Sequence, residues 1–369
     1  MNARFTPARA SAPLPEPLRP RGRGAASNDA GRYERETRAP VDDGWTGAEA
    51  AAPKLRTTLI RDNARSIITR NDSPDISFDH SVNPYRGCEH GCVYCFARPS
   101  HAYWGYSAGI DFESRIFFKP GAPDLLAAAF RKPGYRPEPI LIGANTDAYQ
   151  PVERQLRLTR RLLETCLEFR HPVSVITKSA GIVRDLDILG DLAAQGLAKA
   201  AVSLTTLDAE LARTLEPRAA TPRRRLDAIR ALTGAGVPVT VMTAPIIPGL
   251  NDHEIEALIE AAAGAGARQA GYVLLRLPLE VRDLFRDWLD IHRPNAAAKI
   301  MSLIRQTRGG KDYDARWHVR GVGEGPVAAL IATRFRAAIR RHGLDTPRLA
   351  LRTDLFRVPP EDSAQMSLF

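Results

Sequence analysis

The sequence is poor in cysteine, and three of its four cysteines stand together in one short loop. This count and spacing exclude a disulfide framework and indicate a reducing compartment in which the thiols serve a metal or catalysis. The chain also lacks any apolar run near the roughly 20 residues of a membrane-spanning helix. Its first residues carry scattered charge and many prolines, without the apolar stretch of a secretory signal. We therefore expect a cytoplasmic protein with no membrane partner.

The charge is unbalanced toward the positive, with 52 Lys and Arg against 42 Asp and Glu and a formal net charge of +10. This balance favours a polyanionic partner, although many soluble proteins are basic without one. The composition is otherwise ordinary for a globular protein, at 44% hydrophobic and 25% charged residues. A chain of 369 residues can bury a sizeable core in one large domain or two small ones.

Composition divides the chain into four segments. Residues 1–55 are rich in Ala, Pro, Arg and Gly and show no helix or strand period, so we expect a disordered basic, Pro-rich arm. Residues 56–278 alternate apolar runs with amphipathic stretches and form the expected core. Residues 279–357 predict a basic, mainly helical C-terminal extension, and residues 358–369 a flexible tail.

The alternation within the core predicts repeated strand–helix units between Ile76 and Arg276. Pro139 to Ala144 is typical of a buried strand, Val152 to Phe169 of a helix, and Val173 to Thr177 of the next strand. Short loops between such units require parallel strands with helical crossovers, and about six strands fit. We expect an α/β fold, a partial (βα)6 TIM-like parallel barrel with a C-terminal helical extension and a flexible N-terminal arm. Its chemistry should lie directly after the strands, at their carboxyl ends.

The cysteine loop is the stretch from Arg86 to Phe96, in which Cys88, Cys92 and Cys95 follow the pattern C-x-x-x-C-x-x-C. Two glycines beside the cysteines let the loop fold tightly enough to direct three thiolates at one point. Three converging thiolates with no fourth nearby are the pattern expected of a [4Fe-4S] cluster with one open iron.

Two other metal sites compete for these cysteines. A structural zinc site favours four ligands in C-x-x-C pairs, and even with His90 as the fourth the spacing is not zinc-like. A structural cluster for electron transfer also requires four cysteines. The remaining cysteine, Cys166, lies on the apolar side of the predicted helix from Val152 to Phe169, which favours a buried, inert thiol.

The C-x-x-x-C-x-aromatic-C loop after a first strand resembles the radical SAM enzymes. The resemblance implies that Cys88, Cys92 and Cys95 bind three irons, while S-adenosylmethionine (SAM) chelates the fourth. Reductive cleavage of the sulfonium then yields a 5′-deoxyadenosyl radical that abstracts hydrogen from a substrate. It also implies an electron donor such as flavodoxin or ferredoxin, and it assigns residues 56–278 as the radical SAM core.

Polar residues at later strand ends match that expectation. They are well placed to hold the amino, carboxylate and ribose groups of SAM, with Lys178 and Arg218 as carboxylate candidates. The alternatives are a helix cap at Thr146 or Asp147 and surface salt bridges at Lys178 and Arg218. With the aromatic residue beside the last cysteine, the expected SAM-binding residues are Tyr94, Asn145, Thr146, Asp147, Lys178, Ser203 and Arg218.

Within the superfamily, four motifs are similar to the spore photoproduct lyase branch, often labelled DNA repair photolyase-like. They are Tyr-Arg-Gly-Cys, Asn-Thr-Asp-x-Tyr-Gln-Pro-x-Glu, Thr-Lys-Ser and Glu-Pro-Arg. The similarity implies a lyase-like enzyme with a DNA lesion as substrate. One departure is that the lyase uses an additional cysteine as hydrogen donor near its substrate, whereas the spare thiol here is Cys166. This departure weighs against reversal of a thymine dimer.

The chain ends in Gln365-Met-Ser-Leu-Phe369, which resembles the Q-x-x-L-F peptide that docks on the bacterial DNA sliding clamp. Leu368 and Phe369 would fill an apolar cleft, and Gln365 would supply a hydrogen-bonding end. The alternative is that Phe369 folds back on the domain.

The sequence therefore predicts a radical SAM enzyme that acts on nucleic acid, with DNA favoured, in repair or modification. Radical modification of a protein or small metabolite is a second hypothesis. A third is a non-enzymatic iron–sulfur adaptor that binds DNA or the clamp.

Overall fold

The computed structural model describes residues 22–34 and 55–360, and it is built around a seven-stranded sheet. Six strands run parallel in the order of the chain, and β2 pairs antiparallel with β3 at one edge. Within the described residues no pairing joins β10 to β2, so the sheet is open. The predicted α/β fold with a parallel sheet is confirmed. The strands are β2 (Ile68–Arg70), β3 (His80–Val82), β6 (Ile140–Ile142), β7 (Val173–Thr177), β8 (Ala198–Ser203), β9 (Val239–Ile246) and β10 (Gln269–Leu274).

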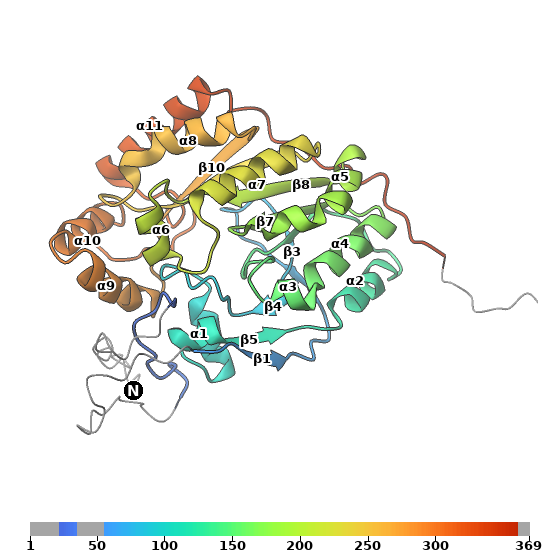
Figure 1. Ribbon diagram of the computed structural model, residues 1–369, viewed down its shortest axis with the longest axis horizontal. Coiled ribbons are helices and arrows are strands. Elements are labelled where there is room, and N and C mark those ends of the chain that lie inside the picture. The colour runs from blue at the N-terminus through green and yellow to red at the C-terminus, as the bar shows by residue number, and fades with distance from the viewer. Residues whose placement is uncertain (1–21, 35–54, 361–369) are drawn as a thin grey trace, which may run out of the picture.

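Alternating residues of each central strand face the main core. In β7, for example, Val173, Val175 and Thr177 are buried while the residues between them are less so. The helices after the strands cover the sheet and pack side by side (Figure 1). These helices are α2 (Ala122–Phe130), α3 (Glu153–Leu156), α4 (Leu158–Glu168), α5 (Leu186–Ala194), α6 (Ala209–Leu215), α7 (Pro222–Gly234) and α8 (Ile255–Gly264).

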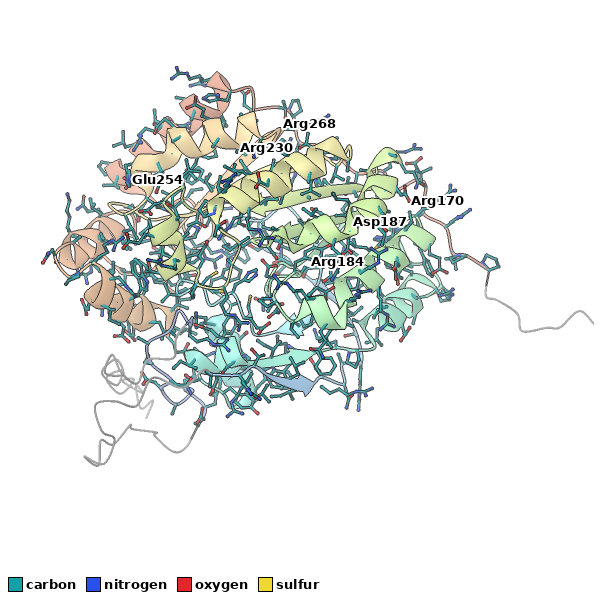
Figure 2. All side chains as sticks on the ribbon, in the orientation of Figure 1. Arg170, Arg184, Asp187, Arg230, Glu254 and Arg268 are labelled. Atoms are coloured by element: carbon teal, nitrogen blue, oxygen red, sulfur yellow. The ribbon has the colours of Figure 1, made fainter. Side chains whose placement is uncertain are left out.

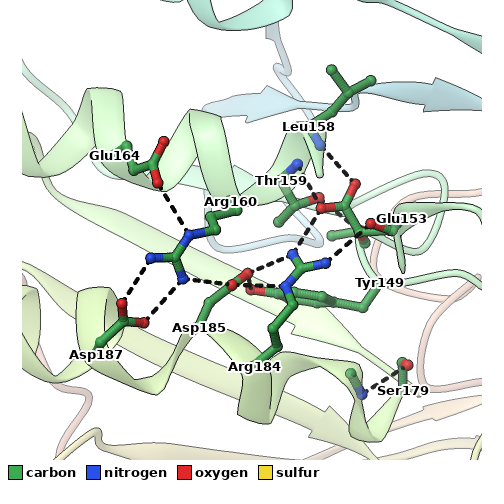
Figure 3. Close-up of polar contacts among 12 residues, drawn as sticks. Tyr149, Glu153, Leu158, Thr159, Arg160, Glu164, Ser179, Arg184, Asp185 and Asp187 are labelled. Atoms are coloured by element: carbon green, nitrogen blue, oxygen red, sulfur yellow. Dashed lines mark hydrogen bonds and ion pairs between the residues drawn. The ribbon is translucent and has the colours of Figure 1, made fainter. Parts of the chain in front are cut away.

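The predicted helix from Val152 to Phe169 is wrong as a single element, because α3 and α4 are separated at Arg157. Arg157 has a left-handed backbone with φ of 50°. The carboxylate of Glu153 accepts hydrogen bonds from the backbone N–H groups of Leu158 and Thr159 at 2.9 and 3.1 Å, which caps the start of α4 (Figure 3). Glu153 also pairs with Arg184 at 2.9 Å. Local capping by a buried carboxylate therefore overrides the continuous apolar pattern.

A small three-stranded sheet carries the cysteine loop. Strand β5 (Arg115–Phe118) pairs parallel with β1 (Thr58–Arg61) and antiparallel with β4 (Tyr85–Arg86). The cysteine loop leaves β4 directly, and the short helix α1 (Ile110–Ser114) precedes β5. The loop is thus held between this small sheet and the carboxyl edge of the main sheet.

The residues after 278 pack on both sides of the core. Helices α9 (Val281–His292) and α10 (Ala297–Gln306) share a second apolar cluster with the cysteine loop, whereas α11 (Gly325–Arg341) packs on α8. Residues 345–357 then run past the amino ends of the strands, where the N–H of Arg352 donates to Gly196 and that of Arg357 to Phe169. The amino edge is covered, which leaves the carboxyl edge for a site. No helix in the described ranges is long and apolar enough to cross a membrane.

Residues 22–34 form an ordered N-terminal strap over the cysteine loop, which differs from the expected disordered arm over residues 1–55. The carboxylate of Glu113 accepts the N–H groups of Gly24 and Ala25, both at 2.9 Å. A Cβ on Gly24 would lie 1.8 Å from the carbonyl oxygen of Gly91, so only glycine permits this approach. Backbone bonds to a distant buried carboxylate order the strap without any apolar period. The rest of the predicted arm and residues 361–369 lie outside the described residues.

The strap meets α9 at Asp287, whose pKa is raised to about 6 by burial and by repulsion from Asp29, Asp283 and Asp290. A folded pKa above the unfolded value means that this acid lowers stability as pH rises from about 4 to 6. A shift of this size corresponds to about 3 kcal/mol for a fully buried group, which solvent screening at this half-buried position reduces to about 1 kcal/mol.

We expect Asp287→Asn to raise the free energy of unfolding by about 1 kcal/mol at pH 7.5 and to leave it nearly unchanged at pH 4. Urea titration at the two pH values measures this difference. Asp191→Asn makes the same charge change at an exposed position on α5 and should have little effect at either pH. An equal effect of Asp287→Asn at both pH values would rule out the repulsion.

Candidate active site

The cysteine loop has the tight backbone that its glycines predict. Gly87 and Gly91 adopt φ values of 77° and 69°. A Cβ on Gly87 would lie 2.8 Å from the carbonyl oxygen of Phe112, and one on Gly91 would lie 2.7 Å from the carboxylate of Glu113. Both positions therefore require glycine, and the loop is pressed against α1.

All three loop cysteines are free thiols; Cys88 and Cys92 are buried, and Cys95 is half-buried. Burial raises the pKa of each, and the neighbouring carboxylates of Asp147 and Glu216 add to the effect at Cys88 and Cys92 respectively. The protein alone therefore keeps these thiols protonated near neutral pH, and a bound metal must displace their protons. Among residues 22–34 and 55–360, no group of three His, Cys, Asp or Glu side chains is gathered closely enough to hold a single metal ion.

The three thiols are close enough to influence one another electrostatically, since Cys92 and Cys95 both raise the pKa of Cys88. Three neighbouring soft thiols, free of disulfides, are a donor set suited to an iron–sulfur cluster. The residues present therefore fit the group that the spacing predicts.

Tyr94, a residue of the cysteine loop itself, is fixed by a buried polar network. Its hydroxyl donates to the carboxylate of Glu216, which also accepts from the hydroxyl of Thr205 at 2.7 Å and from the guanidinium of Arg225. Burial alone would raise the pKa of Glu216, but Arg225, Lys178 and these hydrogen bonds outweigh it and lower the pKa to about 2. Arg225 further donates to the carbonyl oxygen of Ser203 at 3.1 Å. The network locks the loop to the end of β8.

The side chain of Asp147, a predicted SAM contact, already contacts other residues of the protein. Its carboxylate accepts the hydroxyl of Thr177 at 2.6 Å and the N–H of Lys178 at 2.7 Å, and it lies 3.3 Å from Nδ1 of His90. Burial opposes ionisation, but the interaction with His90 and these hydrogen bonds lower the pKa of Asp147 below its usual range. Asp147 therefore joins the loop after β6 to the end of β7 and to the cysteine loop.

The two residues before Asp147 differ in side-chain exposure: Thr146 is buried and Asn145 is exposed. The hydroxyl of Thr146 donates to the carbonyl oxygen of Tyr85 at 3.0 Å, and its N–H is 3.3 Å from the side-chain oxygen of Asn83. Asn145 donates its N–H to the same oxygen at 2.9 Å, but its side chain is exposed at the carboxyl edge. Thr146 thus braces β4, and Asn145 is the residue of the motif whose side chain is free to reach a ligand.

The two cations predicted to bind the carboxylate of SAM differ in whether a carboxylate of the protein already pairs with them. Arg218 pairs with Glu89 of the cysteine loop at 3.1 Å, and its N–H donates to the carbonyl oxygen of His90. The ammonium of Lys178 lies 5.9 Å from the centre of the Tyr94 ring and acts electrostatically on Cys92. No carboxylate within the described part of the chain forms an ion pair with Lys178. Lys178 is therefore the cation available beside the cysteine loop, whereas Arg218 holds the loop in place.

The side chain of Ser203 is buried at the end of β8. All seven predicted SAM-binding residues therefore lie around the carboxyl edge of the sheet or on the cysteine loop, but the side chains of four of them, Tyr94, Thr146, Asp147 and Arg218, already contact other protein groups. Asn145, Lys178 and Ser203 present a polar side-chain group that has no hydrogen-bond or ion-pair partner within the ranges described.

Two buried arginines at the site were not predicted from sequence. Arg98 donates to the carbonyl oxygen of Cys92 at 2.9 Å and pairs with Glu113, and both side chains are fully buried. Arg225 is the second. A signal for Arg225 existed, because it shares a helical face with the buried residues Ala228, Ile229 and Leu232. Arg98 follows the loop in a 3-10 helix (Arg98–Trp104) and has no such period.

Cys166 lies in the main core on α4 and is fully buried, as predicted. Burial raises the pKa of its thiol to about 12. Cys166 is therefore an inert core residue and does not add a fourth thiol to the three of the cysteine loop.

Comparison with known proteins identifies the family. The sequence profile of the radical SAM superfamily matches residues 82–262. The uncharacterized protein Rv2578c of Mycobacterium tuberculosis is 33% identical over 274 residues, which cover 74% of this chain and 77% of that protein. The uncharacterized protein MJ0683 of Methanocaldococcus jannaschii is 28% identical over 196 residues, or 53% of this chain and 70% of that protein. This chain belongs to the radical SAM superfamily.

Solved structures of spore photoproduct lyase share the fold. A single-residue variant of that enzyme aligns with a TM-score of 0.57 at 16% identity, covering 78% of this chain and 81% of the lyase. The lyase complexed with dinucleoside spore photoproduct aligns with a TM-score of 0.53 at 15% identity and the same coverage. Superfamily membership implies SAM and a [4Fe-4S] cluster as cofactors, and it supports radical chemistry by SAM cleavage.

Proposed function

We propose that this protein is a radical SAM enzyme that acts on nucleic acid, with DNA as the favoured substrate. The observation that carries the proposal is the arrangement at the carboxyl edge of the sheet. Three free thiols of one loop lie there beside Lys178, a cation without an ion-pair partner in the described residues. The sheet that carries them is proposed to curve as the partial barrel of this superfamily.

Each part of the site has a proposed task. Cys88, Cys92 and Cys95 would hold the cluster, Lys178 would pair with the carboxylate of SAM, and Asn145 would contact its polar groups. When bound, the cluster and SAM supply a 5′-deoxyadenosyl radical for hydrogen abstraction. The protein's own task is to fix the loop, through Tyr94 and its network, and to shield it from water with the N-terminal strap.

Two observations support nucleic acid as the substrate class. The net charge of +10 favours a polyanion, and the shared fold covers most of a lyase whose structure was solved with a dinucleoside lesion. The burial of Cys166 argues against its use as a hydrogen donor, so we propose a base lesion or modification other than a thymine dimer. The electron would come from a small redox protein such as flavodoxin or ferredoxin. Clamp docking through Gln365, Leu368 and Phe369 falls outside the described residues and stays a prediction.

The test is 5′-deoxyadenosine formation by the reconstituted, reduced full chain across a panel of damaged and modified oligonucleotides. We expect binding of single-stranded DNA to weaken roughly twentyfold between about 50 and 200 mM salt, as for three phosphate contacts. Deoxyadenosine release is expected to rise with one member of the panel. Release that responds to proteins or metabolites but to no nucleic acid would favour the second hypothesis. An intact cluster with no release at all would favour the adaptor.

A further inference from the structure

Arg276 stands at the carboxyl edge of the sheet, shortly after β10 ends at Leu274. Its guanidinium carbon lies 5.0 Å from the centre of the Phe96 ring. Phe96 directly follows Cys95 in the cysteine loop. A cation over an aromatic face is held by electrostatic attraction, so the last strand and the cysteine loop meet at this pair.

Arg276 lacks the partner that other arginines at the site have. Arg98, Arg218 and Arg225 each form an ion pair with a carboxylate of the site. The Nε atom of Arg276 is buried without a hydrogen-bond partner, and within residues 22–34 and 55–360 no ion pair includes this side chain. A buried guanidinium donor left unsatisfied is costly, which indicates a group that an incoming ligand satisfies.

The surroundings of Arg276 identify the open side of the loop. Phe96 is 45% exposed and Cys95 is half-buried, whereas Cys88 and Cys92 are buried. A substrate approaching the thiols therefore passes Phe96 and Arg276.

A second guanidinium makes this side more positive. Arg308 is fully buried and donates to the carbonyl oxygens of Leu275 and Val319, both at 2.7 Å. Burial lowers the pKa of Arg308, and the charge of Arg276 acts in the same direction. Two neighbouring cations attract an anion, and the planar fork of an arginine matches the oxygens of a phosphate.

We propose that Arg276 binds a backbone phosphate of the nucleic acid substrate on the open side of the cysteine loop, with the exposed face of Phe96 beside it as a stacking surface for a base. This inference rests on the proposed function. It assigns to the end of β10 a substrate contact distinct from the SAM contacts at Lys178 and Asn145.

The experiment measures, by fluorescence anisotropy, the binding of a labelled ten-nucleotide oligothymidylate to the reconstituted full chain. Arg276→Gln is expected to weaken binding about tenfold and to reduce the slope of log K against log salt by roughly 0.7, the value for one single-strand phosphate contact. Arg276→Lys keeps the charge without the planar fork, so a loss of about threefold is expected. Arg268→Gln is the matched control, because Arg268 is an exposed residue at the amino end of the same strand (Figure 2). The affinity of the Arg268→Gln variant for the oligonucleotide should stay within about twofold of wild type.

The outcomes separate this inference from the function on which it rests. If the wild type binds the oligothymidylate and Arg276→Gln binds equally well, the phosphate contact is refuted and the proposed function stands. Equal losses in Arg276→Gln and Arg268→Gln would indicate a general charge effect and also refute the contact. If the wild type fails to bind even at low salt, both the contact and the nucleic acid function fall. Circular dichroism and iron content of each variant confirm that fold and cluster are kept.

Discussion

Replacement of Cys88, Cys92 or Cys95 by alanine should abolish 5′-deoxyadenosine formation, with a fall in rate of at least about a thousandfold and loss of bound iron. The three thiols are the soft donors of the loop, and the described residues contain no other cysteine near it, because Cys166 lies in the main core. With one thiol removed, the remaining two cannot hold a cluster that needs all three. Iron and sulfide content and the visible absorbance after reconstitution report cluster loss, and chromatography of the products reports SAM cleavage.

The matched control is Cys166→Ala, which removes a thiol of the same chain without touching the loop. This variant should bind iron and cleave SAM like the wild type, with a loss of stability of about 1 kcal/mol from the small cavity. Any loop variant that still cleaves SAM at the wild-type rate would contradict the ligand assignment. Loss of cleavage in Cys166→Ala with the cluster intact would instead give Cys166 a role that its burial argues against.

The sequence was informative where the relevant interactions are local or follow from topology. The cysteine loop could be predicted because its glycines and thiols lie within one turn-rich stretch. The strand-end rule located Lys178 and Asp147 because parallel strands bring their carboxyl ends to one edge. Position alone could not assign tasks, however. The carboxylate of Asp147 already contacts Thr177, the backbone of Lys178 and His90, and those partners come from two separate segments, the end of β7 and the cysteine loop.

The residues that hold the loop were harder to foresee, because their partners are distant in the chain. Arg218, predicted as a carboxylate-binding residue for SAM, pairs with Glu89, from which four strands separate it in the sequence. The strap at residues 22–34 lies in a Pro- and Arg-rich stretch without an apolar period, and it is held by backbone hydrogen bonds to Glu113 and by the burial of a single small side chain, Ala25, in the second apolar cluster. Such placements follow from tertiary contacts that composition does not record.

Arg98→Gln is expected to lower the free energy of unfolding of the iron-free protein by about 3–5 kcal/mol, because it leaves the carboxylate of Glu113 buried without its partner. Both side chains of this pair are fully buried. The substitution also removes hydrogen bonds to the carbonyl oxygens of Cys92, Ala108 and Gly109. Urea unfolding of the iron-free chain measures the loss without a contribution from the cluster.

The control for Arg98→Gln is Arg115→Gln, since Arg115 pairs with Asp111, which lies on the same short helix α1 as Glu113. The guanidinium of Arg115 is 42% exposed, so its ion pair is screened by solvent and its loss should cost less than about 1 kcal/mol. Similar losses in the two variants would show that burial does not set the strength of these pairs. Because Arg98 also fixes the carbonyl oxygen of Cys92, Arg98→Gln should reduce iron uptake even below its unfolding transition, whereas Arg115→Gln should not. Normal iron uptake by a folded Arg98→Gln protein would mean that the glycines and the Tyr94 network suffice to shape the loop.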